Sequence, residues 1–91
     1  LVLDTATRTV TRSGTKIPLT LKEYSLLEYL MQRPNTVINR EEIFSHVWDF
    51  NDNAFSNVID VHIKNLRKKV DSDYDEPLLE TIRGVGYRIR G

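Results

Sequence analysis

Residues 56–70, with the sequence SNVIDVHIKNLRKKV, predict an amphipathic helix that decides the fold. With about 100° between successive residues, the apolar side chains form one stripe about 60° wide, made of Ile59, Ile63, Leu66 and Val70. A stripe of this kind packs against a core. The opposite face mixes amides, cations and one valine, and comprises Asn57, Val61, Lys64, Asn65 and Lys68. A DNA major groove displays hydrogen-bonding base edges and thymine methyl groups, so this mixed face favours a recognition helix.

The charge of the chain is zero overall but unevenly distributed. The 91 residues include 13 Lys and Arg and 13 Asp and Glu. Residues 56–70 hold four cations against one acid, a net charge of +3, and residues 81–91 hold three cations and no acid, again +3. Phosphate affinity depends on the face presented rather than on the total charge. A neutral domain polarised in this way can bind DNA, with an affinity that depends strongly on salt.

The composition excludes several classes of protein. The chain has no Cys, which rules out disulfides and zinc–thiolate sites and agrees with a reducing cytoplasm. No apolar run is long enough to span a membrane. The first residues, LVLDTATRTV, lack the layout of a signal peptide and do not start with Met, so we expect a piece of a longer cytoplasmic protein.

Strands are predicted at both ends of the chain. Residues 1–19 are rich in β-branched residues, with a turn at residues 13–15 and Pro18 at an edge. Residues 79–90, LETIRGVGYRIR, place two β-rich runs around an Arg-Gly-Val-Gly turn, which predicts a hairpin. Alternation along its second strand predicts an inward pair and a solvent-facing pair, namely Tyr87 with Ile89 and Arg88 with Arg90.

Two shorter helices are predicted between these strands and the amphipathic helix. Thr20 and Glu23 form a T-x-x-E capping box, and apolar residues follow at helical spacing until Pro34. Asn39 and Glu42 form a weaker version of the same cap and predict the second helix. The order of strands, three helices and a terminal hairpin is the layout of a winged helix.

Three stretches of the chain together resemble a known family. Residues 19–49, LTLKEYSLLEYLMQRPNTVINREEIFSHVWD, then residues 56–70 and residues 81–89, TIRGVGYRI, are similar to the DNA-binding effector domain of OmpR/PhoB-type response regulators. The resemblance covers essentially the whole chain. It implies an α+β winged helix-turn-helix with an N-terminal four-stranded antiparallel sheet, three helices and a C-terminal β-hairpin wing. We expect one winged-helix DNA-binding domain over residues 1–91.

The resemblance also implies partners. The domain would bind double-stranded DNA in a sequence-specific manner, as the output of a bacterial two-component system in the cytoplasm. A receiver domain, phosphorylated on Asp through a sensor kinase, would precede it and drive dimerisation on tandem half-sites. Nothing similar to a receiver lies in residues 1–91. The isolated domain is expected to be monomeric or weakly dimeric and to need no cofactor.

Three residues on the outer face are candidates for contacts with bases. Val61 is placed to meet a thymine methyl group, Asn65 can form paired hydrogen bonds with adenine, and Lys64 can reach guanine or a phosphate. The resemblance places base contacts at these positions, often with Arg where Asn65 stands. The alternatives are a scattered surface valine and a solvated amide.

Other residues of the same helix are candidates for phosphate contacts, which position a protein and carry little sequence information. They are Asn57, Arg67 and Lys68, and the resemblance adds a contact from His62. His62 is equally well explained as a hydrogen-bonded boundary residue. Lys68 and Lys69 are equally well explained as cations that complement the helix dipole.

The resemblance extends the DNA contacts beyond the helix. It implies a phosphate contact from the indole of Trp48, which is otherwise a core residue, and one from Thr81. Arg83, before the wing glycines, is a candidate for insertion into a narrow minor groove. Without the resemblance, Arg83 would be an ordinary charge at a hairpin tip.

Two further features leave alternatives open. Asp60, the single acid of the helix, is interpreted as pairing with a neighbouring cation; orienting Arg67 and contacting cytosine are the alternatives. The loop at residues 49–55 touches RNA polymerase in related regulators, which makes Phe50, Asn51 and Asp52 candidates for that contact. A loop that packs Phe50 or Phe55 into the core explains the same residues.

Competing functions are less well supported. The alternative function is a winged-helix module that binds protein and not DNA. Catalysis is rejected because no nucleophile elbow, phosphate loop or metal signature is present. Asp60 and His62 diverge by about 200° on a helix and cannot form a local dyad. No metal site is expected, because neither histidine has a partner at an established ligand spacing.

Overall fold

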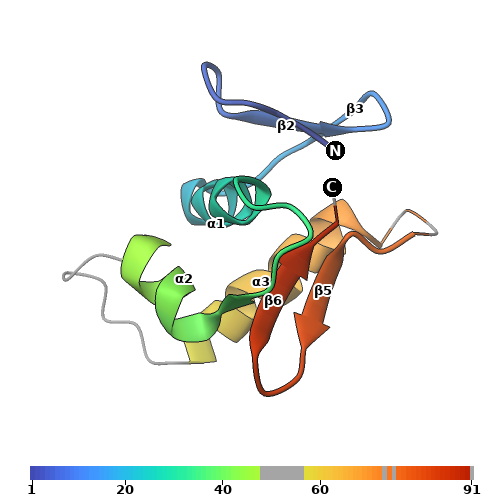
Figure 1. The fold of residues 1–91 in the computed structure, drawn as a ribbon. Helices are drawn as coiled ribbons and strands as arrows, with labels where there is room; N and C mark the ends of the chain where they lie inside the picture. Colours follow the sequence, from blue (N-terminus) through green and yellow to red (C-terminus); the bar gives the residue numbers. More distant parts are fainter. Residues whose placement is uncertain (48–56, 73, 75, 91) are drawn as a thin grey trace.

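The computed structural model describes residues 1–47, 57–72, 74 and 76–90. Within them it forms six strands and three helices in the order β1 (Val2–Asp4), β2 (Thr9–Arg12), β3 (Thr15–Ile17), α1 (Leu21–Met31), β4 (Ile38–Asn39), α2 (Arg40–Val47), α3 (Asn57–Val70), β5 (Leu79–Ile82) and β6 (Gly86–Ile89) (Figure 1). This confirms the predicted winged-helix order of strands, helices and terminal hairpin. None of the described helices is long and apolar enough to cross a membrane.

The N-terminal sheet has the strand order β1-β2-β3 and is antiparallel throughout. The prediction of four strands there was wrong for the described residues, because two turns divide residues 1–17 into three strands and Thr20 then caps a helix. The next strand, β4, pairs with β6 in a second sheet. Register places Leu3, Val10 and Ile17 side by side, and Val10 and Ile17 are buried.

Both predicted helix caps are confirmed. In the capping box of α1, the Glu23 backbone N–H donates to Thr20 Oγ1 at 3.2 Å, and the Thr20 N–H donates to Glu23 Oε1 at 2.9 Å. The Glu42 N–H donates to Asn39 Oδ1 at 2.8 Å, so the last residue of β4 caps α2. Each bond satisfies a backbone group that a helix start leaves without an intrahelical partner.

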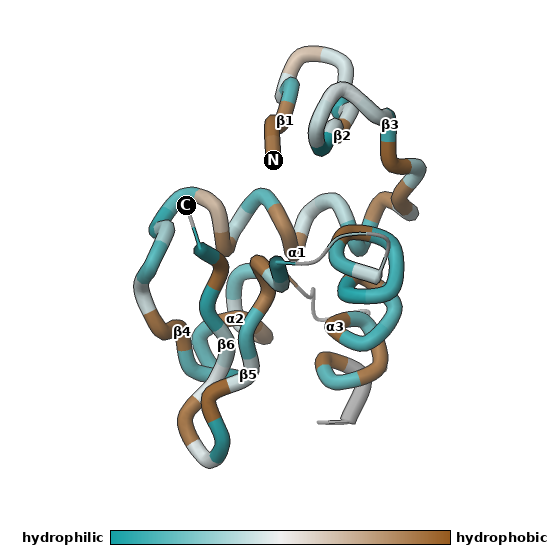
Figure 2. The backbone as a smooth tube through the Cα atoms, turned by 90° about the vertical axis from the view of Figure 1, so that its right-hand side faces the viewer, coloured by the Kyte–Doolittle hydropathy of each residue, from teal (hydrophilic) through white to brown (hydrophobic). Residues whose placement is uncertain are grey.

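The second sheet has the order β4-β6-β5, and its β5–β6 hairpin is the wing. Gly84 adopts a φ of 74° in the turn, where L-residues are disfavoured. At Gly86, a Cβ would lie 2.0 Å from the Ile38 carbonyl oxygen, so only glycine allows β4 to pair with β6 here. The wing tip and the beginning of α3 both lie at the end of the molecule away from the N-terminal sheet (Figures 1 and 2).

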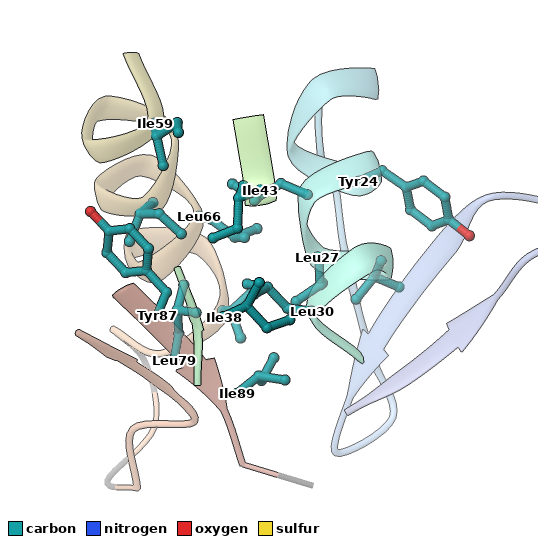
Figure 3. Packing of buried hydrophobic residues seen from close by; sticks show 14 of the residues in the cluster. Tyr24, Leu27, Leu30, Ile38, Ile43, Ile59, Leu66, Leu79, Tyr87 and Ile89 are labelled. Carbon is teal, nitrogen blue, oxygen red and sulfur yellow. The ribbon is translucent and has the colours of Figure 1, made fainter. Parts of the chain in front are cut away.

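The apolar stripe of α3 lies in the core, as predicted. Its four residues are at most 2% exposed and belong to one cluster with α1 and the second sheet, together with residues such as Leu27, Leu30, Ile38, Leu79 and Ile89 (Figure 3). Burying one such side chain stabilises the fold by about 1.5–3 kcal/mol. The stripe therefore fixes which face of α3 remains outside.

A buried ion pair joins the N-terminal sheet to the end of α3. Arg12 Nη1 lies 2.7 Å from Asp71 Oδ1 and also donates to the Val70 carbonyl at 2.7 Å. The Asp71 carboxylate accepts the backbone N–H groups of Leu78 and Leu79, both at 3.1 Å. One carboxylate thus connects the first sheet, the end of α3 and the start of the wing.

Candidate nucleic-acid interface

The outer face of α3 is exposed. Val61 is 51% exposed, and Lys64, Asn65 and Lys68 are exposed beside it. None of these four side chains hydrogen bonds or ion pairs with another residue in the described part of the chain. An apolar side chain gains nothing from water, so this face has the chemistry predicted for contact with DNA bases.

An open groove of about 740 Å³ separates α3 from the wing. The groove is lined by α3, by the β5–β6 hairpin and by residues 39–41, where β4 joins α2. Basic side chains line all three parts, namely Arg40, Lys64, Arg67 and Arg83, against the acids Glu41 and Asp60. The groove is therefore net basic and lies directly beside the exposed face of α3.

Arg67 and Thr81 were predicted as two separate phosphate contacts, and the structure brings them together. Arg67 Nη2 donates to Thr81 Oγ1 at 2.6 Å, and Arg67 Nε donates to the Leu79 carbonyl at 3.3 Å. Arg67, a half-buried residue, thus bonds α3 to β5. This bond fixes the two side chains relative to each other within the lining of the groove.

Asp60 is paired with a cation, as the preferred interpretation held, but that cation is Arg40 and not Arg67. Arg40 Nη2 donates to Asp60 Oδ2 at 3.1 Å, and the Tyr87 hydroxyl donates to Asp60 Oδ1. Burial raises the pKa of Tyr87 to about 12, and the bond to Asp60 adds to the rise. The hydroxyl therefore remains protonated and donating at any physiological pH.

The wing carries less available positive charge than the sequence indicates. Arg88 and Arg90 donate to the Glu80 carboxylate at 3.0 and 2.6 Å, and these bonds hold the pKa of Glu80 below its ordinary value. Arg83, by contrast, is exposed at the tip and bonds to no other described residue. Val85, two residues further along the tip, is 54% exposed, and its apolar side chain there was not predicted from the sequence.

Lys69 does not extend the basic face. Its Nζ lies 2.6 Å from Glu23 Oε1, so it links α3 to α1. Burial by itself raises the pKa of Glu23, but hydrogen bonds from Lys69 and from the Thr20 backbone outweigh this and hold the pKa below 4.5. The explanation offered for Lys69 from the sequence, a cation that complements the helix dipole, did not include this ion pair.

The structure describes only some of the remaining residues that were predicted to contact DNA or RNA polymerase. His62 is half-buried at the boundary of the outer face. Asn57 begins α3, but its side chain lies outside the described part of the chain. The same holds for Trp48 and for the polymerase candidates Phe50, Asn51 and Asp52. Among the described residues, no three His, Cys, Asp or Glu side chains are grouped to hold a metal ion.

Three helices, an exposed outer face on the third and a wing that forms a groove beside it define a winged-helix domain. The family model described as "Transcriptional regulatory protein, C terminal" matches residues 14–89, and the chain belongs to this family. Transcriptional regulatory protein CusR of Escherichia coli K12 is 47% identical over 89 residues, which are 98% of this chain and 39% of CusR. The chain therefore spans well under half of that relative.

Solved structures place the chain in the same family. The crystal structure of the DNA-binding domain of response regulator AdeR, in complex with an intercistronic region, has a TM-score of 0.86 at 32% identity, covering 99% of this chain and 93% of that one. DrrB, a response regulator and OmpR/PhoB homologue of Thermotoga maritima, has a TM-score of 0.85 at 33% identity, covering 98% and 41%. The OmpR/PhoB resemblance is confirmed, and this is a family of transcription regulators rather than enzymes.

Proposed function

We propose that this chain, as one domain over residues 1–91, is the output domain of a two-component transcription regulator and binds double-stranded DNA at particular sequences. The basic groove between α3 and the wing carries the proposal. In a duplex, one sugar–phosphate strand separates the major groove from the minor groove. When one sugar–phosphate strand lies in the groove of the protein, α3 faces the DNA major groove on one side of that strand. The wing tip then faces the DNA minor groove on the other side.

Binding to the phosphate backbone and preference for particular base sequences come from different residues. Lys64 and the Arg67–Thr81 pair face the groove, where a phosphate strand would lie. Further phosphate contacts come from His62 and Lys68, and from Trp48 and Asn57. Such contacts hold the register without specifying sequence.

Sequence preference comes from Val61 and Asn65 on the outer face of α3. Val61 contacts a thymine methyl group, and Asn65 contacts adenine through its amide. Arg83 enters the adjacent minor groove, where a narrow A·T-rich segment has an enhanced negative potential. Its exposure at the wing tip and its lack of a bond within the described residues support this role.

The partners follow from the same proposal. A receiver domain precedes this domain in the cytoplasmic regulator, responds to a sensor kinase, and pairs two copies on tandem half-sites. Pairing raises the affinity of a weakly binding domain without any new contact with the DNA. RNA polymerase contacts the loop that contains Phe50, Asn51 and Asp52. By itself the domain is monomeric or weakly dimeric.

The test is the salt dependence of binding to a duplex recovered from a random pool. The logarithm of the affinity should fall linearly with the logarithm of salt concentration, by about 0.9 per neutralised phosphate. Arg83→Ala should flatten the slope. Arg90→Ala is the matched control, because Arg90 is already paired with Glu80 and should leave the slope unchanged. A module that binds only protein would show no salt-dependent binding to duplex.

A further inference from the structure

Asp60 is the one acidic residue of α3, and it lines the basic groove beside Lys64 and Arg67. A carboxylate in a surface that receives a phosphate strand opposes binding through Coulomb repulsion. Its side chain is 47% exposed, so the repulsion is weakened by solvent but present. The residue therefore needs a role that outweighs this cost.

The bonds of Asp60 join three elements of the fold. One carboxylate oxygen accepts from Arg40, the first residue of α2, and the other accepts from the Tyr87 hydroxyl on β6. Tyr87 is only 5% exposed and packs in the core cluster, so its hydroxyl is held in a fixed position (Figure 3). Asp60 thus bonds α3 to the helix before it and to the wing.

A second bond between α3 and the wing lies two turns further along the helix. Arg67 follows Asp60 by seven residues, about 10 Å along the helix axis, and it bonds to β5 through Thr81. Asp60 bonds to the other strand of the hairpin, β6. Thr81 and Tyr87 are paired across the hairpin, so the two bonds connect one rung of the wing to two positions of α3 about 10 Å apart. Together they resist rotation of the wing against α3, which one bond could not.

We propose that Asp60 is a positioning residue for DNA recognition: it sets the angle between α3 and the wing so that Arg83 reaches the minor groove, and it contacts neither base nor phosphate itself. This inference rests on the function proposed above. It makes a prediction opposite in sign to simple electrostatics. Removing a negative charge from a DNA-binding surface should strengthen binding, whereas removing the positioning residue should weaken it.

The experiment compares four variants of the chain with the unaltered one: Asp60→Ala, Tyr87→Phe, Glu41→Gln and Arg83→Ala. The probes are the duplex that the unaltered chain recovers from a random pool and a scrambled duplex of equal length. Asp60→Ala should bind the recovered duplex roughly tenfold more weakly and lose selectivity over the scrambled one. Tyr87→Phe keeps the buried ring and should lose selectivity in the same direction. Glu41→Gln, which removes another acid from the same groove, should bind up to about twofold more tightly.

A double variant separates positioning from general loss of structure. If Asp60 places the wing, Arg83→Ala should cost less affinity in the Asp60→Ala background than in the unaltered chain. If Asp60→Ala instead causes partial unfolding, it lowers the affinity of the chain by the same factor with and without Arg83→Ala. The cost of Arg83→Ala is then equal in both backgrounds, and this result would overturn the inference. Tighter binding by Asp60→Ala would also overturn it and leave the proposed function intact. Absence of duplex binding by the unaltered chain would overturn both.

Discussion

Arg12 and Asp71 form an ion pair of 2.7 Å in which both side chains are less than 10% exposed, although 59 residues separate them in sequence. The pair links the N-terminal sheet to the residue that follows α3. The Arg12 guanidinium also stacks on the Tyr74 ring, 4.1 Å from its centroid. Removing either partner leaves the other charge buried without its counterion.

Asp71→Ala should destabilise the domain by about 3–5 kcal/mol, because it leaves the buried charge of Arg12 without its counterion. It also removes the acceptor for the backbone N–H groups of Leu78 and Leu79. Urea denaturation followed by far-UV circular dichroism measures this loss. Glu42→Gln breaks the more exposed pair with Arg33 and should cost less than about 1 kcal/mol. Equal losses for the two variants would show that burial of the Arg12–Asp71 pair is not what matters.

Gly86→Ala should destabilise the domain by at least about 2 kcal/mol, because the new Cβ meets the backbone of β4 and the strands must separate. Gly84→Ala is the matched control. Its Cβ would point into open space, so only its positive φ opposes the change, at a cost of about 1 kcal/mol. Thermal unfolding of both variants gives the comparison. If Gly84→Ala were the more destabilising, close approach of β4 and β6 could not explain the glycine at position 86.

Glu23→Gln should lower stability at neutral pH, since it replaces the charged partner of Lys69 while retaining an N3 residue suited to a capping box. The folded-state pKa of Glu23 lies below its ordinary value of 4.5, so its ionised form stabilises the fold above that value. This contribution is lost as pH falls through the lowered pKa. The stability difference between the variant and the unaltered chain should therefore shrink in acid. A difference that stayed constant from pH 7 to strongly acidic pH would contradict the assignment.

Asn65→Arg should change the base preferred at one position of the site from adenine towards guanine, because Arg forms paired bonds with guanine O6 and N7. Selection of bound duplexes from a random pool, carried out in parallel for both proteins, measures the change. Lys68→Gln, on the same exposed face, should weaken binding to all sequences alike. If Asn65→Arg and the unaltered chain recover the same motif, Asn65 does not contribute to sequence preference.

Much of the fold could be predicted from local sequence because local physics decides it. The apolar stripe of α3, the caps at Thr20 and Asn39, and the alternation of Tyr87 and Ile89 follow from periodicity and hydrogen-bonding side chains. The Arg12–Asp71 pair could not be found in this way, since no local pattern relates residues 59 positions apart.

The site was predicted less completely, and one omission had a signal. A three-residue turn that pairs Ile82 with Gly86 also pairs Glu80 with Arg88. The hairpin register alone could therefore have predicted that Glu80 neutralises Arg88. The Arg40–Asp60–Tyr87 contacts had no such signal. They depend on the packing of α2 against α3 and the wing, which tertiary structure alone provides.

In the proposed complex, α3 and the wing contact adjacent major and minor grooves of one duplex. Methylation protection tests this arrangement directly, because dimethyl sulfate modifies guanine N7 in the major groove and adenine N3 in the minor groove. On a duplex recovered by selection, the unaltered chain should protect guanine N7 positions and, across the intervening strand, adenine N3 positions. Arg83→Ala should lose only the adenine protection. Unprotected adenines with the unaltered chain, or adenine protection that survives Arg83→Ala, would contradict minor-groove contact by the wing.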